Sequence, residues 1–241
     1  MASLDLIIPL GNGSRSNDDE LKLCLRSLDR NTQGIGRVIL ATKHIPEWIQ
    51  NVTIVPMGDP LKHNKDGNLI NKVVMALINL DIRGDFLLCA DDNVFNLPLN
   101  LEDIPMICNG RGLNHFSANS DEKWFRRMRR TLEFVKSRGM PVDYNYDSHT
   151  PQKFNATKVL RGLGGIDYAS DIGYCIYTLF RCVSGETGGV HQNEYKTTHE
   201  SEGSVNSSMD RMFVGYNDEA FLHGLRERLF EKYPDKSRYE K

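Results

Sequence analysis

The chain has 241 residues, 39% of them hydrophobic and 26% charged, with a formal net charge of -2. This balance excludes a disordered or fibrous protein, indicates no class of partner, and is enough for one α/β domain with a substantial core. The five cysteines are odd in number, far apart and without C-x-x-C spacing, so we expect reduced thiols in a cytoplasmic protein. The N-terminal MASLDLIIPLG has too short an apolar run for a signal peptide, and no segment is long enough to span a membrane.

The first ninety residues alternate between predicted strands and helices. Apolar runs predict strands at residues 4–10, 37–42, 52–57 and 85–90, and helical spacing predicts helices from Asn17 to about Asn31 and over residues 69–80. Asn17, with Glu20 three residues later, has the pattern of an N-cap. Pro56 confines the third strand to an end or an edge of the sheet.

This order predicts an α/β fold with a mostly parallel sheet covered by helices on both faces. Ligands of such sheets bind at the carboxyl ends of the strands. The loop of residues 11–16 and the pair Asp91 and Asp92 follow two of the predicted strands, so both should lie at that edge.

The rest of the chain is predicted to be less regular. We expect a strand within residues 104–116, a helix over 121–138, another marked by Ile172, Cys175, Ile176 and Leu179, and a last one over 218–233 with Phe221, Leu222, Leu225 and Leu229 inward. Residues 193–208 are polar and without period, which indicates a mobile loop or lid.

The strand in DFLLCADDNVF ends on two adjacent carboxylates, Asp91 and Asp92. Carboxylate oxygens suit a hard cation such as Mg²⁺ or Mn²⁺, which usually binds through one or two carboxylates plus substrate phosphates. A solvated strand end that begins a turn is the alternative.

The loop PLGNGSRSND is a candidate anion site before a helix N-terminus. Gly11 and Gly13 permit close backbone approach, and Ser14, Arg15 and Asn17 offer donors. The loop lacks both the Walker spacing and a full G-x-G-x-x-G, so a simple strand-to-helix turn explains it nearly as well.

Three further segments carry candidate side chains. In DSHTPQKFN, His149 is a candidate general acid or base and Lys153 a candidate charge neutraliser, although a lone histidine beside a proline is more often only a loop residue. Asn68 and Asn71 are candidate contacts to the sugar donor.

In KWFRRMRRTLEFVKSR, the residues opposite the Trp124 stripe form a basic face that is either solvated or suited to a polyanion such as DNA or a donor diphosphate: Arg126, Arg129 and Arg130.

Four blocks of the chain, in the same order, resemble the Stealth proteins and related phage-encoded glycosyltransferases. NDDELKLCLRSLDRNTQGIGRVILATKHIPEWIQNVTIV is similar to their E-L-x-x-x-L-R-S-L helix followed by a strand and x-P-x-W, and FLLCADDNVF to their strand ending in Asn-Asp-Asp. DSHTPQKFN is similar to their His-x-Pro segment, and YNDEAFLHGLRERLFEKYPDKSRYEK to their C-terminal ending. Ala90 stands where an asparagine is usual, and DGNLINKVV where F-N-S is usual.

The resemblance implies a single GT-A-like domain over residues 1–241, with a nucleotide-sugar-binding half (1–95) and an acceptor and lid half (96–241). It assigns Glu20 and Arg26 to the helix motif, Asp91 and Asp92 to the carboxylate pair and His149 to the His-x-Pro block.

We therefore expect a Mg²⁺- or Mn²⁺-dependent glycosyltransferase that moves a sugar from a nucleotide-sugar donor to a hydroxyl of modified phage DNA or of a glycan, in the cytoplasm. A sugar-1-phosphate transferase acting on a polysaccharide, and a non-catalytic nucleic-acid- or glycan-binding protein, are the alternatives.

Overall fold

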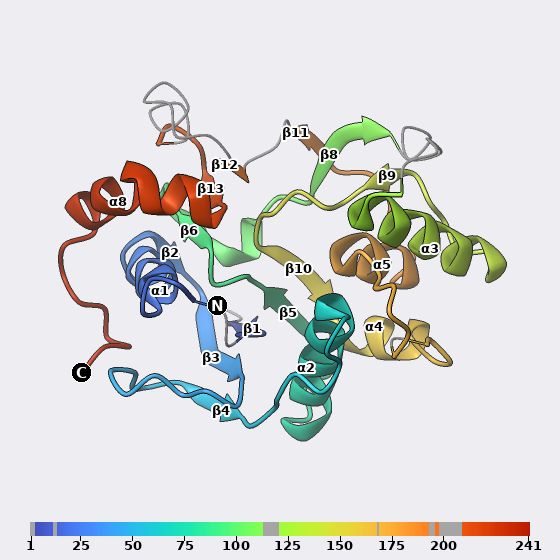
Figure 1. Ribbon diagram of the computed structural model, residues 1–241, viewed down its shortest axis with the longest axis horizontal. Coiled ribbons are helices and arrows are strands. Elements are labelled where there is room, and N and C mark those ends of the chain that lie inside the picture. The colour runs from blue at the N-terminus through green and yellow to red at the C-terminus, as the bar shows by residue number, and fades with distance from the viewer. Residues whose placement is uncertain (1–2, 12–13, 113–120, 168, 193–195, 198–208) are drawn as a thin grey trace.

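The computed structural model describes residues 3–11, 14–112, 121–167, 169–192, 196–197 and 209–241 (Figure 1). Its central feature is a five-stranded sheet in the order β10-β5-β1-β3-β4. The four strands β1 (Leu4–Ile8), β3 (Ile35–Ala41), β4 (Thr53–Val55) and β5 (Asp85–Leu88) run parallel, and β10 (Gln152–Asn155) joins β5 antiparallel. The predicted mostly parallel sheet is confirmed, and β4, which precedes Pro56, lies at its edge as expected.

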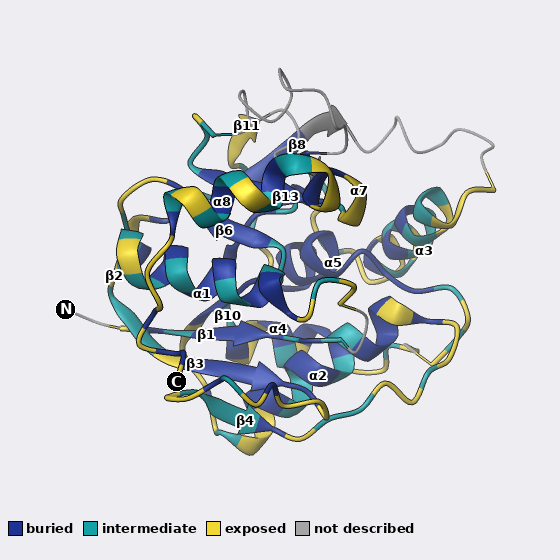
Figure 2. Cartoon of the chain, turned by 60° about the vertical axis from the view of Figure 1, so that its left-hand side comes forward, coloured by how far each residue is buried: buried dark blue, intermediate teal, exposed yellow. Residues whose placement is uncertain are grey.

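The two faces of the sheet are covered by different helices, as Figures 1 and 2 show. Side chains alternate along a strand, so neighbouring residues of β1 enter different cores. Leu6 and Ile8 pack in the cluster that includes Leu25 of α1 (Asp19–Asn31), whereas Ile7 packs in the cluster that includes Val73 of α2 (Lys65–Asn79). The helices therefore hold the sheet from both sides.

The start of α1 differs from the prediction. Asn17 and Asp18 both have left-handed backbone angles, with φ of 57° and 60°, and the cap residue Asp18 makes no side-chain capping bond. The predicted capping pair of Asn17 and Glu20 is therefore wrong. Ser14 Oγ instead makes the side-chain hydrogen bonds at the start of this helix. It accepts one from the Asp18 backbone N–H at 2.9 Å and donates one to Glu20 Oε2 at 2.9 Å.

The start of α2 lies four residues before the predicted one. Asn64 caps it, because its side-chain oxygen accepts a hydrogen bond from the Gly67 N–H at 2.8 Å. The polar first turn carries no apolar period, which is why the periodicity pointed to a later start.

Three small sheets and further helices lie outside the central sheet in the described part of the chain. The sheets are β12 (Lys196–Thr197), β13 (Phe213–Tyr216) and β6 (Asn93–Phe95); β11 (Val190–Gln192), β8 (Ile107–Gly112) and β9 (Tyr144–Asn145); and β2 (Thr32–Gln33) with β7 (Leu99–Asn100). The helices are η1 (Leu101–Asp103), α3 (Lys123–Ser137), α4 (Ala156–Gly162) and α5 (Ile176–Val183). The predicted strand within 104–116 and the helix over 121–138 are confirmed.

The C-terminal helix is kinked. It consists of α7 (Asp218–Ala220), the π-helical turn η3 (Phe221–Leu225) and α8 (Arg226–Lys232), with non-helical angles at His223 and a φ of 115° at Gly224. The kink leaves Leu222 45% exposed, so its predicted inward position is wrong, whereas Phe221, Leu225 and Leu229 are buried.

Candidate functional site

Asp91 and Asp92 lie in the turn between β5 and β6, three and four residues past the last strand residue Leu88. Because β5 runs parallel to β1 with Leu88 opposite Ile7, this turn emerges at the same edge as Gly11. Asn93 fixes the turn: its side-chain oxygen accepts from the Ala90 N–H at 3.2 Å, and its amide donates to Asp92 Oδ1 at 3.4 Å.

The carboxylates at this edge outnumber the cations that act on them. The pKa of Asp91 is raised to about 7, because burial and the charges of Asp92 and Glu20 raise it and the charge of Lys65 only partly opposes them. Both aspartates are half-buried. Like charges in a partly desolvated site disfavour double ionisation, so binding of a cation there would be favourable.

The metal ligands that the described residues can offer are few. Among them, no three side chains of His, Cys, Asp or Glu are arranged to hold an ion by themselves. Two carboxylates are nevertheless the usual protein share of a Mg²⁺ site whose other ligands are water and substrate phosphates.

The glycine loop is described in part. Gly13 lies outside the described residues; Gly11 is half-buried, and a side chain there would meet no atom within 4 Å. Ser14 is bonded to Glu20 as above, and Arg15 forms an exposed ion pair with Asp218 at 3.6 Å. Ser14 and Glu20 therefore belong to the edge of Asp91, whereas Arg15 is drawn toward the C-terminal helix.

The segment of His149 docks on the aspartate turn. The His149 carbonyl accepts a hydrogen bond from the Asn93 amide at 3.1 Å, and His149 itself has a left-handed φ of 50°. Its Nε2 lies 3.8 Å from Asp147 Oδ1, and Asp147 is in turn held by the Trp124 indole N–H at 2.8 Å. The structure thus brings His149 beside the carboxylate pair and adds Asp147 as a group that can orient its ring.

Three other predicted donor-binding residues have structural partners. Arg26 makes two hydrogen bonds to Glu240, at 2.9 and 2.8 Å, and further bonds to the carbonyls of the C-terminal segment. Asn68 is tied to the backbone of Leu61 through both ends of its amide, and Lys153 donates to the Glu102 carbonyl at 2.9 Å. Asn71 lies half-buried on α2.

The basic residues of α3 do not form one outward face. Arg126 is exposed, and Arg129 is half-buried. Arg130 is only 18% exposed, because it pairs with Asp167, donates to the Ile172 carbonyl and lies 4.4 Å from the Tyr174 ring centroid. The predicted grouping of the three arginines is therefore wrong for Arg130, since α5 and the segment before it cover that side of α3.

The structure also shows residues that the sequence reading missed. Lys72 is fully buried in the apolar helix α2, with its ammonium 2.6 Å from Asp59 Oδ1 and 2.8 Å from the Leu10 carbonyl. Asp59 lines a cavity of about 550 Å³ just past the carboxyl ends of β3 and β4. The available signal was a lysine inside an apolar helical stripe, which has to find a partner when it is buried.

Tyr216 is a second missed residue. Its hydroxyl is buried and has no hydrogen-bond partner among the described residues. Burial raises the pKa of Tyr216 well above its ordinary value, and the charges of Asp92 and Glu20 raise it further. The phenol therefore remains a proton donor beside the carboxylate edge.

Comparison with protein-family models and with curated proteins found no match to this chain. The fold and the site define a mixed α/β protein whose mostly parallel sheet carries a half-buried carboxylate pair at the carboxyl end of an inner strand. Within the described residues, no helix is both long enough and apolar enough to cross a membrane.

Proposed function

We propose that the chain is a metal-dependent glycosyltransferase with a GT-A-like sheet, which uses a nucleotide-sugar donor and a hydroxyl acceptor in the cytoplasm. The observation that carries the proposal is the pair Asp91 and Asp92, half-buried and crowded by Glu20, at the edge where ligands of parallel sheets bind. The sequence blocks around the pair resemble Stealth proteins and related phage-encoded glycosyltransferases, and this resemblance supports a nucleotide sugar as the donor.

The pair suits Mg²⁺ or Mn²⁺ in its chemistry, because both side chains offer hard carboxylate oxygens and Asp91 lacks enough neighbouring positive charge. A bound ion would offset the negative charge that develops on the departing nucleoside diphosphate. Asn93 holds the turn that presents the carboxylates, through its bonds to Ala90 and Asp92.

The cavity bounded by Asp59 is where the nucleoside of the donor would lie. It is next to the glycine loop, because buried Lys72 bonds both to Asp59 and to the Leu10 carbonyl. In this proposal Lys72 positions the loop and the aspartate, and it does not touch the reacting atoms.

The acceptor hydroxyl needs a group to take its proton. His149, with Asp147 at 3.8 Å to orient its ring, is one candidate, and a carboxylate of the pair is the other.

A panel of nucleotide sugars tests the proposal. The protein is incubated with Mn²⁺ and each donor, and the nucleotide products are separated by chromatography, with and without EDTA. We expect one donor to yield a nucleoside diphosphate only when free metal is present. Release of a monophosphate would identify a sugar-1-phosphate transferase, and turnover that EDTA leaves unchanged would contradict the metal-dependent mechanism.

A further inference from the structure

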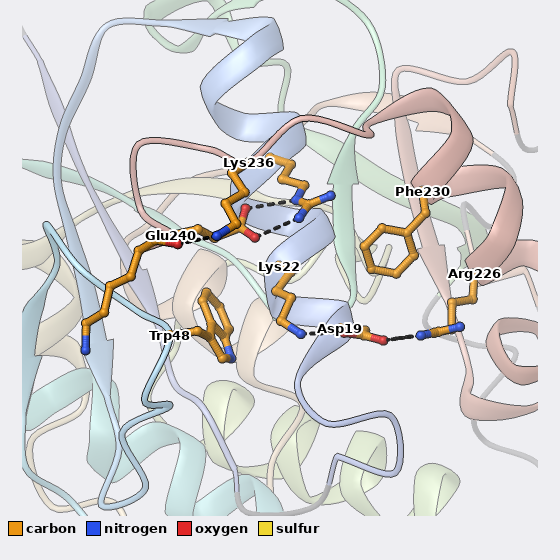
Figure 3. A pocket seen from close by; sticks show the side chains of 9 residues that line it. Asp19, Lys22, Trp48, Arg226, Phe230, Lys236 and Glu240 are labelled. Carbon is orange, nitrogen blue, oxygen red and sulfur yellow. Dashed lines mark hydrogen bonds and ion pairs between the residues drawn. The ribbon is translucent and has the colours of Figure 1, made fainter.

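A second cavity, of about 410 Å³, lies between α1, α8, the loop of Trp48 and the C-terminal segment (Figure 3). Five of its lining side chains are cationic: Lys22, Arg26, Arg226, Lys236 and Lys241. Of the described side chains that line it, two are acidic, Asp19 and Glu240. Cations thus outnumber acids in this cavity, whereas acids outnumber cations around Asp91, Asp92 and Glu20.

Both acids of the cavity are already neutralised. Asp19 accepts hydrogen bonds from Lys22 at 2.7 Å and from Arg226 at 2.9 and 2.5 Å. Glu240 accepts from Arg26 and from Ser237, and these bonds hold the pKa of its carboxyl below the ordinary value although burial acts to raise it. Lys236 and Lys241 donate to main-chain oxygens of Lys241 and Glu47. Positive charge therefore remains in excess around the cavity.

Two aromatic rings complete its wall. Trp48 and Phe230 lie on opposite sides of Lys22 in Figure 3. The Lys22 ammonium is 5.5 Å from the Trp48 ring centroid, and the guanidinium groups of Arg26 and Arg226 are each 5.3 Å from that of Phe230. Such a site combines flat apolar surface with several cationic donors, which suits a ring that carries an anionic group.

The cavity adjoins the candidate site through the first turn of α1. Asp19 lines the cavity, while its neighbour Glu20 acts on Asp91. Successive residues of a helix point about 100° apart, so one helical turn contributes to both sites. A ligand held in the cavity would thus lie along the same helix as the carboxylate edge.

We propose that this cavity binds an anionic sugar unit, bearing a carboxylate or a phosphate, of the acceptor saccharide. The binding itself follows from the cavity, whereas the acceptor role rests on the proposed glycosyltransferase function. The cavity has a volume in the range of small-molecule pockets, and its two aromatic rings lie in one place. A nucleic-acid strand instead uses a row of stacking platforms along a groove, so the cavity favours a single sugar ring.

Calorimetric titration of the full chain, without donor or metal, tests the binding. The probes are trigalacturonate, mannose 6-phosphate, neutral maltotriose and a 16-nucleotide oligothymidylate. We expect one of the two acidic saccharides to bind, the other and maltotriose to bind more weakly or not at all, and the affinity to fall as salt is raised. Binding of carboxylate or phosphate distinguishes the two sources of negative charge.

The variant Lys236→Gln with Lys241→Gln removes two exposed charges and should weaken acidic-saccharide binding about tenfold. Its matched control, Lys136→Gln with Lys158→Gln, removes two exposed charges from α3 and α4 and should leave the affinity unchanged. Trp48→Leu, checked for folding by its melting temperature, should weaken binding by removing a ring of the wall.

Three results would overturn the inference: neither acidic saccharide binds, maltotriose binds equally well, or the oligonucleotide binds more tightly with dependence on Lys236 and Lys241. The variant Asp91→Asn with Asp92→Asn should keep the saccharide affinity. If that variant loses turnover and the wild type binds no saccharide, saccharide binding by the cavity is refuted and the proposed function stands. If the variant keeps its turnover and the wild type binds an acidic saccharide, the proposed function is refuted and saccharide binding by the cavity stands.

Discussion

Two neighbouring residues of α1, Asp19 and Glu20, belong to regions with opposite electrostatics. Glu20 adds a third carboxylate to Asp91 and Asp92, and the pKa of Asp91 rises to about 7. Asp19 instead lies among cations, with Lys22 and Arg226 in direct contact. The same helical turn thus lines one region that lacks positive charge and another that has an excess of it.

The two regions also differ in how a carboxylate affects the stability of the fold. Glu240 has Arg26 and Ser237 as partners, which hold its pKa below the ordinary value, so its ionised form stabilises the folded state. Asp91 has a raised pKa, so its ionised form is disfavoured in the fold. Residues kept in an arrangement that costs stability often serve function, and this is the physical argument for placing the proposed reaction at Asp91 and Asp92.

Replacement of the pair by Asp91→Asn with Asp92→Asn should have the largest effect. If the proposed function holds, turnover of the nucleotide sugar should fall by about 100-fold or more, because the two side chains proposed to bind the metal lose their charge. The melting temperature should stay the same or rise, since like-charge repulsion is removed. Asp81→Asn, at an exposed surface pair with Arg83, is the control and should leave both measurements unchanged. Retained turnover in the double variant would place the reaction elsewhere.

Arg26→Ala should destabilise the fold strongly, because it breaks a nearly buried ion pair whose side chains are 11% and 4% exposed. We expect a loss of about 3 kcal/mol in the free energy of unfolding, measured in urea. Arg238→Ala removes a more exposed pair with Asp29 and should cost no more than about 1 kcal/mol. Equal losses in the two variants would show that burial does not distinguish these pairs.

The ion pair of Glu240 with Arg26 should make the free energy of unfolding depend on pH. Because the folded pKa of Glu240 is below its ordinary value of 4.5, its contribution is fully present above that pH and is lost as pH falls through the folded pKa. The difference in unfolding free energy between wild type and Glu240→Gln should therefore be constant above about pH 5.5 and narrow below about pH 4.5. A difference that persists unchanged into more acidic solution would contradict this role.

Two arginines of α3 should give the smallest effects and differ from each other. Arg126 is exposed, so Arg126→Gln should change the unfolding free energy by no more than about 0.5 kcal/mol. Arg130→Gln should cost about 1 kcal/mol or more, since Arg130 bonds to Asp167 and Ile172 and packs on Tyr174. If oligonucleotide binding depended on Arg126 with a steep salt dependence, α3 rather than the α1 cavity would be the polyanion site.

The order of the first strands and helices could be predicted because each has a strong local pattern. Apolar runs mark β1, β3 and β5, helical spacing marks α1 and α2, and Pro56 marks an edge. Element boundaries were less accurate where polar residues form the end. Ser14 and Asn64 determine the starts of α1 and α2 through hydrogen bonds that no hydrophobic period reveals.

Part of the candidate site was also predictable. Asp91, Asp92 and the strand that carries them could be read directly, and the parallel order placed them beside the glycine loop. Lys72 and Asp59 could not be paired from the sequence, because the partner of a buried lysine depends on which loop lies over its helix. The predicted lid of residues 193–208 lies outside the described residues except for β12, so that prediction is untested.

The sequence by itself determined the four parallel strands of the sheet, the two helices that cover them and the carboxylate pair at their carboxyl edge, because these depend on local periodicity and on strand order. Only the tertiary structure decided which charged side chains are neutralised by a partner of opposite charge and which lie among like charges. Arg26 and Glu20 lie on the same helix, yet one holds Glu240 from the end of the chain and the other crowds Asp91. The physical reason is that the energy of a charge depends on its neighbours in space and on its exposure to water, and long-range packing sets both.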